Sequence, residues 1–139
     1  KAVHEFDALL GKRAPEELQL ATKLLKSISD NDVDSAKACV GAGADLMLLD
    51  GHGNVPVHHA RSAGMAVMLA RAMPRALQVR NQHGQAPLQT VGARLPLEVG
   101  TAELLIDGKL HNLLALDKDG VSAFMQMQGD ARRHFESQL

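Results

Sequence analysis

A polar tetrad that recurs three times along the chain most constrains its fold. The tetrads DGHG, NQHG and DKDG begin at positions 50, 81 and 117, and an apolar segment follows each one. Each has Asp or Asn, then two residues, then Gly, which is the composition of a tight turn whose Gly adopts a positive φ. The three glycines are 31 and 36 residues apart. Recurrence at this period predicts stacked structural repeats.

Proline marks where helices begin after the tetrads. Pro56 and Pro87 each stand three residues after a tetrad glycine. Pro is tolerated in the first turn of a helix, whose N–H groups have no partner within the helix. The segments between tetrads are too short for anything but paired short helices, with Gly64 as the turn within the second pair. We predict helices near 2–10 and in pairs over 16–29 and 33–41, 56–62 and 65–73, 87–93 and 98–107, and 123–128 and 130–138.

Two further motifs carry a family resemblance. The stretch NDVDSAKACVGAGADLML, from Asn31 to Leu48, ends in GAGADL, and VPVHHA begins at Val55. They resemble the GADV-type helix terminus and the T-P-L-H-x-A motif of ankyrin repeats, whose period is about 33 residues. The resemblance implies an all-α ankyrin-repeat solenoid of stacked antiparallel helix pairs with protruding turns. It covers about residues 18–139, and the implied units are a capping helix at 1–17 and repeats at 18–49, 50–80, 81–116 and 117–139.

The sequence departs from the ankyrin pattern at positions that usually join repeats. The family's Thr before Pro is replaced in the second and third repeats, and its His survives only as His58. Gln89 and Met125 stand at the equivalent positions. We expect these changes to weaken the hydrogen bonding between repeats. The third repeat is the most irregular, at residues 93–103 and 107–117, and Pro96 excludes a continuous helix through the first of these segments.

Composition excludes several classes of partner. Fifteen basic and sixteen acidic residues give a net charge of -1 and are interspersed, whereas phosphate binding needs a clustered basic surface. We therefore expect no nucleic-acid partner. A single cysteine rules out an internal disulfide framework and favours a reducing compartment. No apolar run approaches the roughly 20 residues of a membrane helix. We expect no membrane association and a cytoplasmic location, which would be the host cytosol for a secreted effector.

The histidines raise the question of a metal site. Ligands on one zinc ion lie about 3–4 Å apart, given Zn–N distances near 2.1 Å. His52 and His83 occupy the same position in successive repeats, so about 10 Å should separate them. Adjacent helical residues such as His58 and His59 point about 100° apart and do not converge. We therefore expect no metal, a structural role for His58 and an exposed contact role for His59. His111 is the fifth histidine of this apparent ligand set.

Other reactive residues also have structural interpretations. Cys39 occupies a position that the ankyrin family fills with Leu, so a buried, inert thiol is expected. Acidic residues at 30, 32 and 34 mark a helix entry, and those at 117 and 119 lie in a turn. Met65, Met68 and Met73 have core spacing on one helix, with a Met-rich recognition groove as the alternative. No catalytic residue, cofactor or enzymatic activity is expected for this chain.

Ankyrin resemblance implies a non-catalytic module that binds another protein through its turn tips and concave helix face. Carried over by position, the implied contact residues are Gly51, His52, Asn54, His59, Ser62, Ala63, Gln82, His83, Gln85, Ala93, Arg94, Lys118, Asp119 and Val121.

Two alternatives stay open. The chain could be the targeting domain of a larger bacterial effector enzyme, since certain type III effectors, including arginine ADP-riboxanases of the OspC kind, carry ankyrin domains that capture host caspases. It could also be a scaffold in a self-assembling oligomer. The scaffold alternative requires an uncovered apolar face at the end of the array, which Phe124 and Phe135 could supply.

Overall fold

A computed structural model describes residues 15–139, and within that range the regular structure is entirely helical. The predicted helix near 2–10 and most of the predicted cap at 1–17 lie outside the described residues. The α-helices are α2 (Pro15–Ser29), α3 (Val33–Gly41), α4 (Ala63–Ala72), α5 (Pro87–Arg94), α6 (Val99–Ile106), α7 (Ala123–Gln126) and α8 (Gly129–Glu136). Three short 3₁₀ helices complete the set: η1 (Pro56–His59), η2 (Pro74–Gln78) and η3 (Leu110–Leu113).

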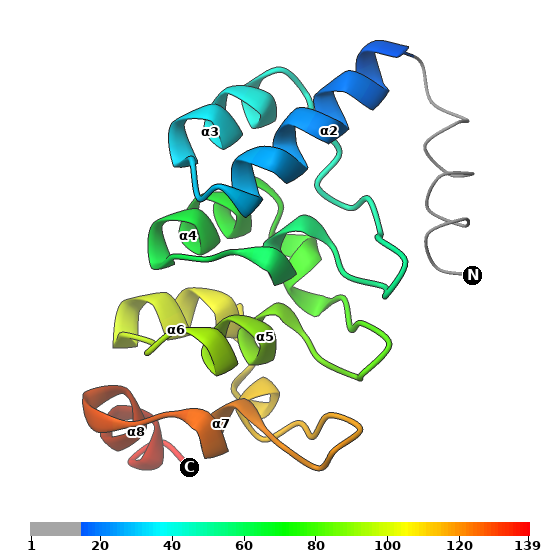
Figure 1. The fold of residues 1–139 in the computed structure, drawn as a ribbon. Helices are drawn as coiled ribbons and strands as arrows, with labels where there is room; N and C mark the ends of the chain where they lie inside the picture. The colour runs from blue at the N-terminus through cyan, green and yellow to red at the C-terminus, as the bar shows by residue number, and fades with distance from the viewer. Residues whose placement is uncertain (1–14) are drawn as a thin grey trace.

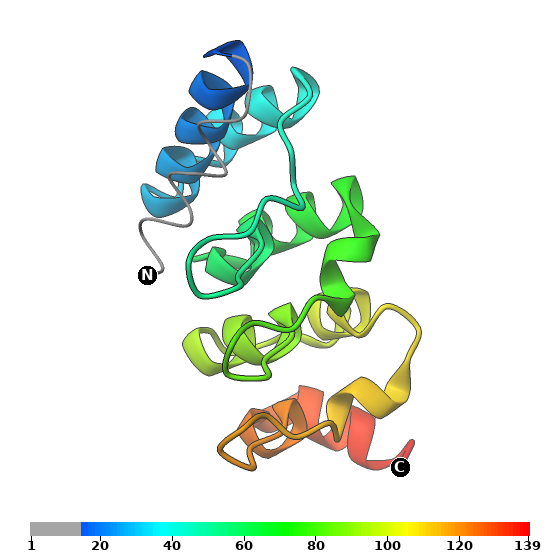
Figure 2. The ribbon, with the colours of Figure 1, turned by 90° about the vertical axis from the view of Figure 1, so that its right-hand side faces the viewer.

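Helices are arranged in four layers stacked along one axis (Figure 1). The layers are α2 with α3, η1 with α4, α5 with α6, and α7 with α8. The first member of each pair lies nearer the long loops, which project on the right in Figure 1, and the second member lies on the left. Figure 2, turned by 90°, shows the projecting loops one above another. This arrangement confirms an all-α fold built from helix pairs.

Capping explains where several helices begin. The side chain of Asp32 accepts a hydrogen bond from the backbone N–H of Ser35 at the start of α3. Ser62 does the same for α4 and Ser122 for α7. Pro87 stands at the first position of α5, where its missing N–H costs nothing. The starts of α3 and α5 agree with the prediction, because the signals at Asp32 and Pro87 are readable in the sequence.

Five details of the helix prediction were wrong. The first helix of the second layer ends at His59 as a single 3₁₀ turn, and Gly64 lies inside α4 because Ser62 caps that helix earlier. Met73 is the residue after α4 and not part of it. The expected long insertion at 93–103 is a loop of four residues, 95–98, because α5 and α6 extend into it from both sides. The segment 107–117 contains η3, which sequence reasoning did not predict.

The core consists mainly of aliphatic and small side chains between the layers. Met65, Leu69 and Leu88 are almost fully buried, as are several alanines on α4 and α6. Cys39 is a free, buried thiol, as predicted. Phe135 is also buried, and Phe124 is partly covered by the guanidinium of Arg132, 4.5 Å from the ring centroid. These two rings therefore do not form the uncovered terminal face that the scaffold alternative requires.

The three tetrads form the same turn. The first residue of each tetrad accepts two backbone N–H bonds through one side-chain oxygen; for Asp50 the donors are His52 and Asn54, at 2.8 and 2.9 Å. Equivalent pairs of bonds occur at the second and third tetrads. The tetrad glycines have φ between +76° and +79°, a conformation that glycine adopts without strain. The predicted turns are confirmed.

One side chain in each of two layers forms a bridge to the following layer. The imidazole of His58 accepts from the backbone N–H of Val55 at 3.0 Å and contacts the carbonyl of Gln85 at 2.9 Å. Gln85 is the fourth residue after the start of the second tetrad. The structural role predicted for His58 is thus confirmed.

Gln89 forms the equivalent bridge one layer further on. Its Oε1 accepts from the N–H of Ala86 at 2.9 Å, and its Nε2 donates to the carbonyls of Ala115 and Val121 at 3.1 and 3.2 Å. Val121 directly follows the third tetrad, as Gln85 directly follows the second. The expectation that losing the family's His weakens this junction was wrong, because an amide also carries an acceptor and a donor at one end of a side chain.

Among the described helices, none is both long enough and apolar enough to span a membrane.

Replacing Gln89 with Met should lower the free energy of unfolding by about 2–3 kcal/mol, because buried backbone groups would lose their partners. Urea denaturation at pH 7.5 measures the change. Gln78→Met is the matched control, since Gln78 is exposed and should change stability by less than about 0.5 kcal/mol. Equal losses in the two variants would contradict the bridging role.

Candidate functional site

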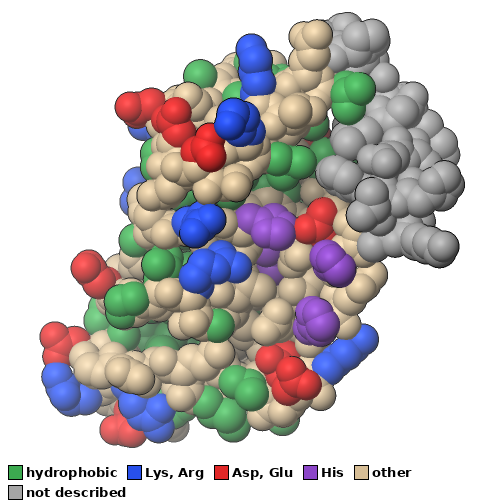
Figure 3. Space-filling model, viewed as in Figure 1, with side chains coloured by type: hydrophobic (Ala, Val, Ile, Leu, Met, Phe, Trp, Pro, Cys, Tyr) green, Lys and Arg blue, Asp and Glu red, His purple; other side chains and the backbone are tan. Residues whose placement is uncertain are grey.

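The candidate site is the face formed by the projecting turns and the first members of the helix pairs. Figure 3 shows this face, with histidines and acidic side chains near the turns and basic side chains beside a histidine in the middle layers. None of the fourteen predicted contact residues is buried. Eight of them are exposed and six are half-buried.

Turn tips supply the exposed part of this face. His52, His83, Lys118 and Asp119 are all exposed. Their backbone is fixed from one layer to the next, because the N–H of Gln82 donates to the carbonyl of His52 and the N–H of Lys118 donates to that of His83, both at 2.9 Å. The tips therefore present their side chains from a positioned backbone.

Several predicted contact residues also hold the layers together. Asn54 accepts from the amide of Asn81 at 2.9 Å, which joins two successive turns. The Ser62 hydroxyl donates to the side chain of Asn31 at 2.9 Å. Gln82 donates through its amide to the carbonyl of Gly51 at 3.0 Å. Sequence position alone did not reveal these structural roles.

The half-exposed His59 is paired with Asp50. Its Nε2 lies 2.7 Å from a carboxylate oxygen of Asp50. Burial alone would raise the pKa of Asp50, but hydrogen bonds from the N–H groups of Asn54 and His52, from His59 and from the Asn54 amide outweigh it and hold that pKa below its usual value. Asp50 is therefore an anion whose oxygens are occupied by its own turn and by His59.

His58 is held in its neutral form. Backbone N–H of Val55 can only donate, so Nδ1 of His58 must accept and the ring proton is on Nε2, directed at the carbonyl of Gln85. Burial lowers the pKa of His58, and its proximity to His59 lowers it further, although the hydrogen bond to the carbonyl of Gln85 acts in the opposite direction. An imidazolium would lose the Val55 bond.

Neither the histidines nor the cysteine assemble into a reactive cluster in the described part of the chain. Among the side chains of residues 17–139, no three from His, Cys, Asp or Glu lie close enough together to hold a metal ion. The side chain of Asp32 is occupied as a helix cap.

A first hollow lies between α2 and η1, and we call it the basic hollow. It has a volume of about 370 Å³ and is lined by Leu25, Ile28, Ser29, Asp50, His59, Arg61 and Arg94. Arg94 reaches it from the end of α5 and donates to the carbonyls of His58 and Ala60 at 3.3 and 2.8 Å. Sequence reasoning missed Arg61, which precedes the α4 cap and carries no local signal of its surroundings.

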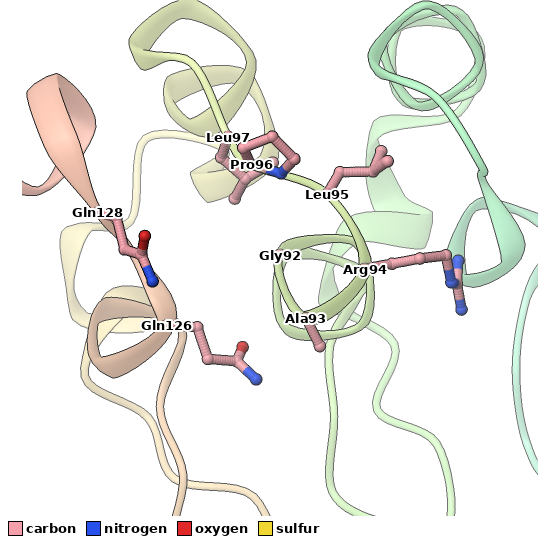
Figure 4. Close-up of a pocket in the computed structure, with 8 residues that line it drawn as sticks. All are labelled: Gly92, Ala93, Arg94, Leu95, Pro96, Leu97, Gln126 and Gln128. Carbon is pink, nitrogen blue, oxygen red and sulfur yellow. The ribbon is translucent and has the colours of Figure 1, made fainter.

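A second hollow, the amide pocket, lies between α5 and the α7–α8 junction. It has a volume of about 460 Å³ and is lined by Gly92, Ala93, Arg94, Leu95, Pro96, Leu97, Gln126 and Gln128. Figure 4 shows both glutamine amides directed into the gap toward α5, while Arg94 extends away toward the preceding layer. Part of this pocket comes from the irregular segment that the sequence identified as distinctive.

Two features define the wall of the amide pocket and its polarity. A Cβ added at Gly92 would lie 3.2 Å from Leu97 Cδ1, so the absence of a side chain allows the 95–98 loop to approach α5. Oε1 of Gln126 is buried and has no hydrogen-bond partner among the described residues. A bound segment with an N–H group could satisfy this oxygen.

No family model matches the chain, and no curated protein is significantly similar to it.

Acidification should destabilise the fold partly through His58. The unfolded imidazole has a pKa near 6.5, while the folded pKa is lower, so the unfolded state binds more protons as the pH falls through about 6.5. The stability is fully present above that pH and declines below it. His58→Gln, which imitates Gln89, should stay folded at pH 7.5 and show a smaller decrease in free energy of unfolding between pH 7.5 and 5.0.

Urea titrations at several pH values measure this difference, and His111→Gln is the control because His111 is exposed. An identical pH dependence in wild type and His58→Gln would exclude the proposed effect of burial.

Proposed function

We propose that this chain is a degenerate ankyrin-repeat domain that binds another protein through its turn tips and inner helix face and catalyses no reaction itself. The ankyrin assignment is supported by the tetrads at their recurring period, by the VPVHHA and GAGADL motifs, and by four stacked helix layers with turns projecting on one side. Stacked repeats offer an extended surface of this kind for recognition.

The observation that carries the proposal is the row of turn tips. Each tip is tied by a backbone hydrogen bond to the next, yet His52, His83 and Asp119 remain exposed. A partner that binds such side chains loses little conformational entropy of the loops, because the loops are already ordered. The basic hollow, which includes Asp50 of the first turn, and the amide pocket at the end of α5 provide concave places for partner side chains.

Affinity capture from cell extract, quantified by mass spectrometry, tests this surface. The variant His52→Ala, His83→Ala, Asp119→Ala should retain the fold and lose at least about tenfold of the captured partner, since central contacts contribute most binding energy. The control variant Lys37→Ala, Arg71→Ala, Arg75→Ala changes exposed residues on α3, α4 and η2 and should capture as wild type does.

Equal capture by the tip variant and wild type would reject the tip surface while leaving the fold assignment intact. Circular dichroism of each variant separates lost binding from lost structure. The effector alternative keeps the same surface and changes only its context. A host caspase among the proteins captured from host-cell extract would support that alternative.

A further inference from the structure

The basic hollow holds two cations that no carboxylate of residues 17–139 neutralises. Neither Arg61 nor Arg94 forms an ion pair with an acidic side chain in that range. Among the described residues, the Arg61 guanidinium makes one hydrogen bond, a long one of 3.4 Å to the carbonyl of Ser29. A guanidinium carries five N–H donors, so both arginines keep donors for a further acceptor.

The one acidic group in the hollow is already occupied. Asp50 accepts from two backbone N–H groups, from the amide of Asn54 and from His59. Two guanidinium charges against this one carboxylate leave a net charge of +1 when His59 is neutral. A single additional carboxylate would balance that charge, whereas a dianionic phosphate would exceed it and lie near Asp50.

The other wall of the hollow is apolar. Ile28 is almost fully buried and Leu25 is half-buried, both on α2. The volume of about 370 Å³ is at the small end of ligand pockets, which suits one or two side chains. Basic groups on one side and aliphatic groups on the other fit an acidic residue next to an apolar one.

We propose that the basic hollow binds an Asp or Glu side chain of the partner protein, in a segment whose neighbouring apolar residue packs on Leu25 and Ile28. The carboxylate accepts charge-assisted hydrogen bonds from Arg61 and Arg94, and the planar guanidinium group suits such pairing. This proposal rests on the proposed protein-binding function and specifies the chemistry of one contact within it.

Selection of phage-displayed random 12-residue peptides on the purified chain tests the inference. Enriched peptides should share an acidic residue beside an apolar one. For the best synthetic peptide, fluorescence anisotropy should show at least about a tenfold loss of affinity when its acidic residue becomes the amide, and a similar loss on Arg61→Gln. Arg71→Gln is the matched control and should bind within about twofold of wild type.

Arg94 also donates to backbone carbonyls, so replacing it would remove structural hydrogen bonds. The second variant is therefore another change at Arg61, Arg61→Glu. The Arg61→Glu variant should bind the acidic peptide poorly. A peptide with Lys in place of the acidic residue should bind this variant more tightly than the acidic peptide does. Failure to enrich acidic peptides, or unchanged affinity on Arg61→Gln, would overturn the inference.

The capture experiment separates the two proposals. Loss of partner in the tip variant together with full capture by Arg61→Gln would keep the protein-binding function and reject the acidic contact. If neither variant changes capture, both surfaces are rejected.

Discussion

The fold depends on a bridge that each of two layers makes to the next one. His58 and Gln89 occupy the same position in successive layers, and each joins the start of its own helix to a carbonyl in the following turn. Each bridge lies beside the helix interface and is almost fully buried. Because buried polar groups must be paired, this bridge fixes the register of one layer on another. The third equivalent residue, Met125, is exposed, and its side chain has no N–H or O–H to donate.

The register that the bridges set also allows neighbouring turn tips to form hydrogen bonds with one another. Once Gln85 and Val121 are held by the preceding layer, their turns lie close enough for backbone bonds between neighbouring tips. The side chains at the tips do not take part in those backbone bonds and remain available to a partner. In the function proposed above, stability and recognition thus use different atoms of the same turns. The hydrogen bonds between neighbouring turns order the loops and leave the side chains at the tips exposed.

The two hollows are formed by side chains and loops that lie between neighbouring layers. In the amide pocket, Gly92 lacks a side chain and the loop with Pro96 closes one wall. In the basic hollow, Arg94 spans from the third layer to the carbonyls that end η1. Both hollows use residues of neighbouring layers, so neither exists within a single repeat. The site is a property of stacking.

The sequence by itself determined the local structure of this protein. The tetrad turns, the helix entry at Asp32 and the prolines at helix starts were predicted, because each depends on hydrogen bonds or sterics within a few residues. Most of the helices followed from these signals. The tertiary structure alone decided that Gln89 replaces the histidine bridge, that Asn54 joins two turns, and that Arg61 and Arg94 meet at one hollow. The partners in these contacts are about 25 to 36 residues apart along the chain, as Asn54 and Asn81 or Arg94 and His58 are. Their meeting is set by how layers pack, and no local pattern records it.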